Sequence, residues 1–138
     1  MSIELARLEF KSNGRGFVEI TAEVNQKIMS SQIENGLCHL FLMHTSASLL
    51  ITENADRDVR ADLETFMQKC APDGDPSYRH DMEGADDMPA HIRSVLTATE
   101  LTVPIRNGRL ALGTWQGIYL WEHRYQPHLR RVELTLTG

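Results

Sequence analysis

Cysteines are scarce in this sequence, and their spacing excludes a common role for them. The 138 residues include only Cys38 and Cys70, which form no C-x-x-C pair. A disulfide-stapled scaffold is therefore excluded, and a chain of this length buries enough apolar surface to fold without one. Both cysteines are expected to be small buried hydrophobes in a reducing compartment.

Long hydrophobic runs and basic clusters are also absent. No window approaches the roughly 18 apolar residues of a membrane-spanning helix, and the first five residues lack the basic and apolar regions of a signal peptide. Aromatic residues make up 7% of the chain, and they do not alternate with lysine and arginine in the way typical of nucleic-acid-binding surfaces. These absences predict a cytoplasmic protein with neither a membrane nor a nucleic acid as its partner.

The acidic residues that are present gather in one segment. The chain has 19 aspartates and glutamates against 14 lysines and arginines, for a net charge of −5. Four of the acidic residues lie within seven positions: Asp81, Glu83, Asp86 and Asp87. They fall in a stretch from 71 to about 89 that lacks hydrophobic periodicity, and loops of that length in small domains are usually functional or disordered.

Hydrophobic periodicity predicts a single α+β domain over residues 1–138, with a largely antiparallel sheet that is sandwich-like or barrel-like. Two to three helices are expected, at 24–34, at 56–70 with Asp56 as N-cap, and from Pro89 onward. Strands are predicted at 16–20, 37–43, 48–52, 101–105, 109–112, 114–121 and 130–136. Asn107-Gly108, between two of these strands, is the strongest hairpin signal in the chain.

Three histidines are candidates for a metal site. His44 ends a predicted strand, and His80 and His91 bracket the acidic segment. Imidazoles from a strand end, a loop and a helix start would form an open site for a divalent ion, with Asp81 or Asp87 as a further ligand. No H-E-x-x-H spacing is present, and a hydrogen-bonded core histidine beside a solvated acidic loop explains the same residues.

Three further segments carry groups that suit a phosphorylated ligand. Thr45 and Ser46 offer hydroxyls in a tight turn that is either an anion cradle or ordinary turn chemistry. Glu122 and Arg124 end a predicted strand, where they form a surface pair or, for the arginine, a phosphate site. The segment 113–117 places two glycines around a tryptophan, which suits a pocket wall or a core tryptophan that needs room.

Five motifs together resemble the YjbQ family, and their order and spacing extend over nearly the whole chain. The motifs are His44-Thr45-Ser46-Ala47-Ser48, Glu53-Asn54-Ala55-Asp56, Tyr78-Arg79-His80, Ala90-His91-Ile92 and the stretch from Gly108 to Ile118, which contains Leu112-Gly113-Thr114-Trp115-Gln116. The resemblance implies a small mixed α/β fold with largely antiparallel sheet that assembles as a homotrimer or a pair of trimers. It also implies a metal site at His44, His80 and His91 and a weak, secondary thiamine-phosphate synthase activity. That reaction joins hydroxymethylpyrimidine diphosphate to a thiazole phosphate and releases pyrophosphate.

The residues and the resemblance lead to the hypothesis of a metal-dependent transferase that acts on a phosphorylated small molecule, with zinc or magnesium as its divalent cofactor. The acidic segment would repel a diphosphate unless a cation lay between them. The residues assigned to catalysis are Asp81, His91 and Glu122. Those assigned to substrate binding are Thr45, Ser46, Asn54, Thr114, Trp115, Gln116 and Arg124. The alternative is a trimeric protein that binds a metal or a phosphorylated ligand and whose catalysis is incidental.

Overall fold

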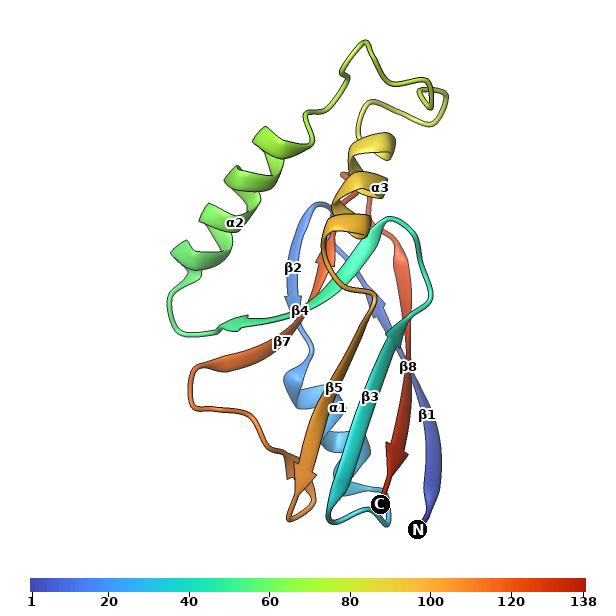
Figure 1. The fold of residues 1–138 in the computed structure, drawn as a ribbon, viewed down its shortest axis with the longest axis vertical. Coiled ribbons are helices and arrows are strands. Elements are labelled where there is room, and N and C mark those ends of the chain that lie inside the picture. Colours follow the sequence, from blue (N-terminus) through green and yellow to red (C-terminus); the bar gives the residue numbers. More distant parts are fainter.

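The computed structural model describes residues 1–138 as two antiparallel sheets with three helices around them (Figure 1). The five-stranded sheet has the order β1-β8-β3-β5-β6, with β1 Ile3–Lys11, β8 Leu129–Thr137, β3 Gly36–Leu42, β5 Glu100–Arg106 and β6 Arg109–Leu110. The three-stranded sheet has the order β2-β7-β4, with β2 Gly16–Glu19, β7 Gln116–Glu122 and β4 Ala47–Glu53. The helices are α1 Thr21–Met29, α2 Arg57–Cys70 and α3 Asp87–Leu96. The predicted α+β class with largely antiparallel sheet is confirmed.

The hydrophobic core is formed by alternate residues of both sheets together with one face of α1. The inward residues of the two central strands are Cys38, Leu40 and Leu42 of β3 and Val132, Leu134 and Leu136 of β8. Burial raises the pKa of the Cys38 thiol to about 12, so this cysteine is a packing residue. Cys70, also expected to be buried, is exposed at the end of α2.

Helix α2 stands beside the rest of the molecule. It begins after Asp56, as predicted, and the carboxylate of Asp56 accepts a hydrogen bond from the backbone N–H of Asp58. The helix makes little contact with the other helices and strands, as Figure 1 shows, and its Phe66 is 62% exposed. None of the three helices has both the length and the apolar composition needed to cross a membrane.

Strand β1 is absent from the predicted elements, although its sequence carries the signal. Ala6, Leu8 and Phe10 alternate with charged residues, and they pack against the core while the other face of the strand is exposed. The strand pairs with β8 along its whole length. The first and last strands of the chain therefore lie side by side.

Two helix boundaries also differ from the prediction. Helix α1 ends at Met29, because the chain turns after Ser30, where the hydroxyl and the backbone N–H of Ser31 both bond to the carbonyl oxygen of Ile28. Helix α3 begins at Asp87, two residues before Pro89. This second difference matters for function, because it places the last part of the acidic segment in the first helical turn.

Candidate metal centre

Helix α3 presents a carboxylate and an imidazole side by side at its start. Asp87 and His91 are four residues apart, so their side chains lie on the same face of the helix. The Nε2 atom of His91 lies 3.4 Å from Oδ2 of Asp87. Asp87 is almost fully buried and sits in the first turn, where the helix dipole favours a negative charge.

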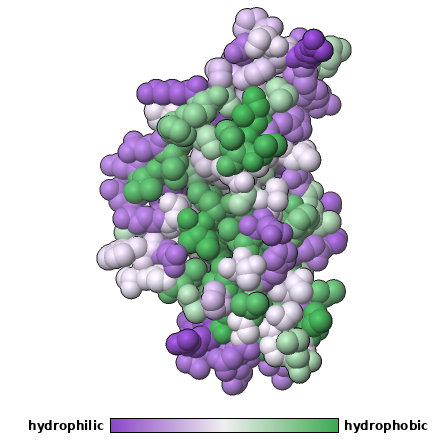
Figure 2. Space-filling model, viewed as in Figure 1, coloured by the Kyte–Doolittle hydropathy of each residue, from purple (hydrophilic) through white to green (hydrophobic).

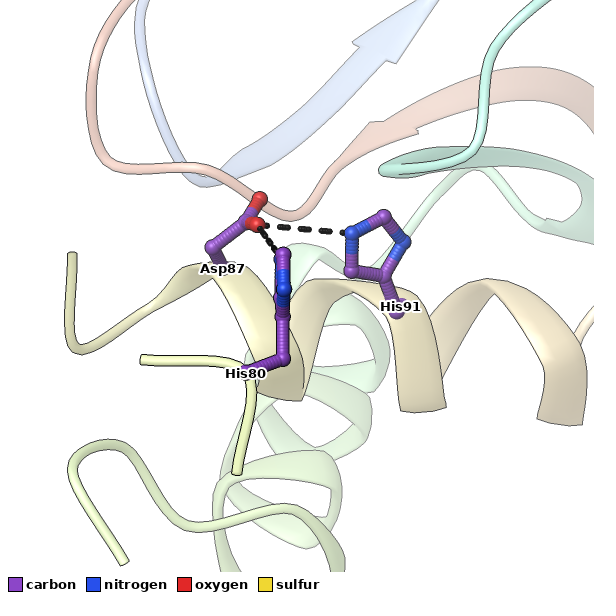
Figure 3. A group of neighbouring side chains, drawn as sticks. All are labelled: His80, Asp87 and His91. Carbon is purple, nitrogen blue, oxygen red and sulfur yellow. Dashed lines mark hydrogen bonds and ion pairs between the residues drawn. The ribbon is translucent and has the colours of Figure 1, made fainter. Parts of the chain in front are cut away.

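The third group of the cluster comes from the loop 71–86. His80 points at the same carboxylate oxygen, and its Nε2 lies 2.6 Å from Oδ2 of Asp87 (Figure 3). One ligand atom from each of His80, Asp87 and His91 lies within 4.8 Å of the others. Glu83 is close to this cluster, since its Oε2 lies 3.8 Å from Nε2 of His80.

Arg124 fixes the loop and orients the carboxylate. Its guanidinium donates hydrogen bonds of 3.0, 2.7 and 2.8 Å to Oδ2 of Asp86, Oδ1 of Asp87 and the carbonyl oxygen of Glu83. Burial acts to lower the pKa of Arg124, but the hydrogen bond that it donates to Asp86 and the charges of both aspartates raise it above its ordinary value. Because Oδ1 of Asp87 is held by the arginine, Oδ2 is the oxygen that faces the two imidazoles.

The backbone of Thr45 fixes the ring of His91. The Nδ1 atom of His91 lies 3.1 Å from the carbonyl oxygen of Thr45. A carbonyl oxygen only accepts hydrogen bonds, so Nδ1 carries the hydrogen, and the lone pair of the neutral ring is on Nε2, the atom that faces Asp87. A backbone carbonyl behind the ring is the usual support of a metal-bound histidine.

The donor set fits a transition metal such as zinc. Two imidazoles with one carboxylate are a common zinc ligand set that leaves a coordination position open, whereas magnesium prefers oxygen ligands alone. Ligand atoms of a tetrahedral zinc site lie roughly 3.4 Å apart, and His91 and Asp87 already have a separation of 3.4 Å. His80 and Asp87 lie 2.6 Å apart, so a bound ion would widen that gap by about 0.8 Å.

The carboxylate of this cluster is already ionised. Burial acts to raise the pKa of Asp87, but the hydrogen bond with His80 and the charge of Arg124 outweigh it and hold the pKa below its ordinary value. A carboxylate must lose its proton to bind a metal ion. Asp87 therefore has the charge state that a ligand needs.

His44, predicted as the third imidazole ligand, lies outside this cluster. Its Nε2 accepts a hydrogen bond of 2.8 Å from the backbone N–H of Arg131, so Nδ1 carries the ring hydrogen and neither nitrogen has a free lone pair. Burial and the charge of Arg130 lower the pKa of His44, which keeps the ring neutral. His44 and His91 line the same hollow of about 390 Å³, so the strand end does approach the site.

Two of the residues assigned to catalysis are separate from the cluster. Asp81 is exposed on the loop and lines a hollow beside His80. Glu122 is fully buried, forms an ion pair with Arg130 and accepts a hydrogen bond of 2.6 Å from Ser12. Burial acts to raise the pKa of Glu122, but the hydrogen bonds from Arg130 and Ser12 lower it. The predicted surface pair of Glu122 with its neighbour Arg124 does not form, because each of the two has a different partner.

The residues assigned to substrate binding are divided between the two ends of β7. Arg124 and Thr45 lie at the end of the strand, beside His91, and Ser46 accepts a hydrogen bond there from Arg130. Those at its start are Asn54, Thr114, Trp115 and Gln116. A strand of seven residues is about 20 Å long, so the structure does not bring the two groups together around one small molecule.

Comparisons with known proteins place this architecture in a group of similar chains. A family model described as "UPF0047 protein YjbQ-like" matches residues 6–138. The chain is 51% identical to the UPF0047 protein YjbQ of Salmonella typhimurium, with 90% of each chain covered, and 48% identical to the UPF0047 protein sll1880 of Synechocystis, with 95% and 89% covered. Among solved structures, a YbjQ-like protein of unknown function from Sulfolobus solfataricus has a TM-score of 0.86 at 25% identity, with 99% of both chains covered.

The predicted activity is not upheld by these relatives. The closely similar sequences are described only as UPF0047 proteins, and the Sulfolobus structure is described as a protein of unknown function. The prediction of a metal-dependent enzyme with secondary thiamine-phosphate synthase activity is therefore wrong as a conclusion from family membership. The structure gives a physical reason as well, because the residues assigned to the substrate lie at two separate ends of a strand.

Proposed function

Because the chain belongs to the UPF0047 YjbQ-like family, whose relatives named above are described without an activity, we propose a function from the site alone. The protein binds one divalent transition-metal ion through Nε2 of His80, Oδ2 of Asp87 and Nε2 of His91. The observation that carries the proposal is the convergence of these three groups within 4.8 Å. The proposal concerns binding of the ion and assigns no reaction to it.

The surroundings of the three groups support this function. Both ligands on helix α3 are held by a second partner. Arg124 bonds to Oδ1 of Asp87, and the carbonyl oxygen of Thr45 bonds to Nδ1 of His91, so that Oδ2 and Nε2 are left facing the site. Such supporting partners raise the affinity of metal sites by holding the ligands in position. Zinc is the ion that suits the donor set best, with a water molecule or an exogenous ligand at the fourth position.

Metal titration of the chelator-treated protein tests the proposal. Isothermal titration calorimetry with zinc chloride should give one site per chain, and cobalt(II) in place of zinc should give the visible absorption of a tetrahedral ion. Replacing His80 or His91 with alanine, or Asp87 with asparagine, should weaken binding at least about 100-fold. Asp81→Asn is the matched control, because Asp81 is an exposed carboxylate of the same loop outside the cluster, and its affinity should equal that of the wild type.

Two results would contradict the proposal. One is a protein that takes up no stoichiometric zinc or cobalt after removal of the chelator. The other is a His80→Ala variant that binds as tightly as the Asp81→Asn control. Enzymatic activity, assembly into a homotrimer or a pair of trimers, a phosphorylated ligand and a cytoplasmic location all stay predictions of the sequence.

A further inference from the structure

Three buried nitrogen atoms without a hydrogen-bond partner lie in one region, between α2, α3 and the end of β7. They are Nε and Nη2 of Arg93 and Nδ1 of His123, and both side chains are 0% exposed. Buried polar groups are nearly always paired, because an unpaired one loses its bonds to water without replacement. Leaving three unpaired would use a large part of the small stability of a single domain. An acceptor group therefore belongs in this place.

Arg93 directs one edge of its guanidinium to this place. Its Nη1 donates to a carboxylate oxygen of Glu64 on α2, and the other oxygen of Glu64 accepts a hydrogen bond of 3.2 Å from the indole of Trp121. Nε and Nη2 form a different edge of the planar group, and no protein atom accepts from them. Their parallel N–H bonds match the two oxygens of a carboxylate or a phosphate.

His123 adds a third donor in the same region. Its Nε2 lies 2.8 Å from Oγ of Ser48. We assign the hydroxyl as the donor, because its hydrogen has no other acceptor, and this assignment places the ring hydrogen on Nδ1. The His123 ring packs against Trp121, with ring centres 5.0 Å apart. Burial and, next, the charge of Arg93 lower the pKa of His123 to about 3. The ring is therefore neutral, and its Nδ1 has no partner in the protein. It lies in the region of Arg93, because Glu64 bonds to both Arg93 and Trp121, the residue on which the ring packs.

We propose that this region is a binding site for a small oxyanion, a carboxylate or a phosphate, held by the Nε–Nη2 edge of Arg93 and by Nδ1–H of His123. Arg15 and Arg130, each paired with one carboxylate, bring further positive charge near His123. The site shares no residue with the metal centre and does not depend on it.

No hollow of the molecule is lined by Arg93 or His123, so an element must move to admit a ligand. Helix α2, whose Glu64 bonds to Arg93, is the element that we expect to move. It makes little contact with the other elements, and four side-chain hydrogen bonds attach it to the body of the fold. Arg60 donates to Tyr119 and to the carbonyl oxygen of Glu53, and Glu64 accepts from Arg93 and Trp121. Figure 2 shows hydrophobic side chains over both α2 and α3 on the face that it draws. A helix attached at so few points can move outward without disrupting the sheets.

Nuclear magnetic resonance of the ¹⁵N-labelled full chain tests the proposal. The chain has two tryptophans: the indole of Trp121 bonds to Glu64 beside the site, and Trp115 is 63% exposed at the start of β7. We would titrate sodium phosphate, sodium acetate and the neutral acetamide at constant ionic strength, with chelator present. The indole N–H resonance of Trp121 should shift to saturation with phosphate or acetate, and that of Trp115 should not. The better-binding anion identifies the source of the oxyanion.

Thermal unfolding and two variants complete the test. The melting temperature should rise by about 5 °C or more at a hundredfold excess of the anion over its Kd. Arg93→Lys keeps the charge but loses the parallel N–H pair, so it should weaken binding at least about tenfold, whereas the exposed control Arg131→Lys should bind as the wild type does. If Arg93→Lys does not fold, Ser48→Ala takes its place. Without the Ser48 hydroxyl, Nε2 of His123 loses its partner and the ring hydrogen is no longer held on Nδ1, so the affinity for the anion should fall.

Several outcomes would overturn the proposal. The first is a Trp121 resonance that moves no more than that of Trp115 at saturating phosphate and acetate. The second is an equal effect of acetamide, which would show that an uncharged acceptor suffices. The third is an unchanged affinity of Arg93→Lys or, where that variant does not fold, of Ser48→Ala. A crystal structure with an ordered water molecule bonded to Arg93 and His123 in the presence of these anions would also reject the oxyanion.

Discussion

Replacing His123 with glutamine should make the protein less sensitive to acid. The buried ring has its pKa lowered to about 3, by burial and then by the charge of Arg93, whereas a histidine of an unfolded chain titrates near 6.5. Between these values the unfolded chain binds a proton that the folded protein cannot bind. The free energy of unfolding is therefore highest above pH 6.5 and falls as the pH is lowered toward 3.

The size of the effect follows from the gap between the two pKa values. Each pH unit inside the gap removes about 1.36 kcal/mol, so the two units between pH 6.5 and pH 4.5 remove about 2.7 kcal/mol. That is a substantial part of the roughly 5–15 kcal/mol that stabilises a domain. Glutamine can keep a hydrogen bond to Ser48, the partner of the His123 ring at 2.8 Å, but it does not titrate. The loss of stability between pH 7 and pH 4.5 should be about 2.7 kcal/mol smaller in His123→Gln than in the wild type.

Urea unfolding at pH 7 and pH 4.5, followed by far-ultraviolet circular dichroism, measures this difference. The buffers should contain chelator and neither carboxylate nor phosphate, so that no ligand shifts the equilibrium. His39→Gln is the control for the loss of a histidine as such, because His39 lies on β3 with 37% of its side chain exposed. An equal loss of stability in wild type and His123→Gln would refute the reasoning that His123 is buried in its neutral form.

Three further outcomes are expected. Glu122→Gln leaves Arg130 as a buried unpaired charge and should lower the free energy of unfolding by about 3–5 kcal/mol in a urea titration. Glu133→Gln breaks a partly exposed ion pair with Arg7 and should lower it by less than about 1 kcal/mol in the same assay. Arg124→Met removes the support of Asp87 and should weaken zinc binding about 10–100-fold in calorimetry. Gly36→Ala places a methyl group 1.8 Å from the carbonyl oxygen of Thr137 and should destabilise the fold by more than about 3 kcal/mol in the same urea assay.

Elements whose signal is local were predictable from the sequence. Helix α2 starts at its predicted N-cap Asp56, because capping depends on a few adjacent residues. The turn at Asn107 and Gly108 joins β5 to β6 as predicted, with φ angles of 52° and 76°, because few residue types adopt positive φ. The end of α1 was placed too late, since Ser31 turns the chain by bonding to the carbonyl oxygen of Ile28 and the backbone N–H of Gln32 bonds to Glu4 of β1. The second bond is a tertiary interaction that no local pattern reveals.

The site was predictable only in part for the same reason. His80 and His91 were candidates from their places beside the acidic segment, and the structure does bring them together. Asp87 takes the position expected of His44, and its spacing of four from His91 on a helix was a usable signal. The position of His44 depends on a backbone N–H of Arg131, distant in the sequence. Such a competitor for the imidazole lone pair cannot be identified before the strands are paired.

The anchoring of the loop 71–86 determines at which step, folding or metal binding, the loop loses its conformational entropy. Asp73 bonds to Arg15, and Asp86 to Arg124, so both ends of the loop are tied to the body of the fold by groups other than the three ligands. The conformational entropy of the loop is therefore lost when the chain folds, before any cation arrives. Binding then needs the small separation of His80 from Asp87 and the loss of the hydrogen that lies between Nε2 of His80 and Oδ2 of Asp87. The metal-free protein should accordingly resist proteolytic cleavage in this loop as well as the zinc-bound protein does, unlike small domains that fold only around their metal.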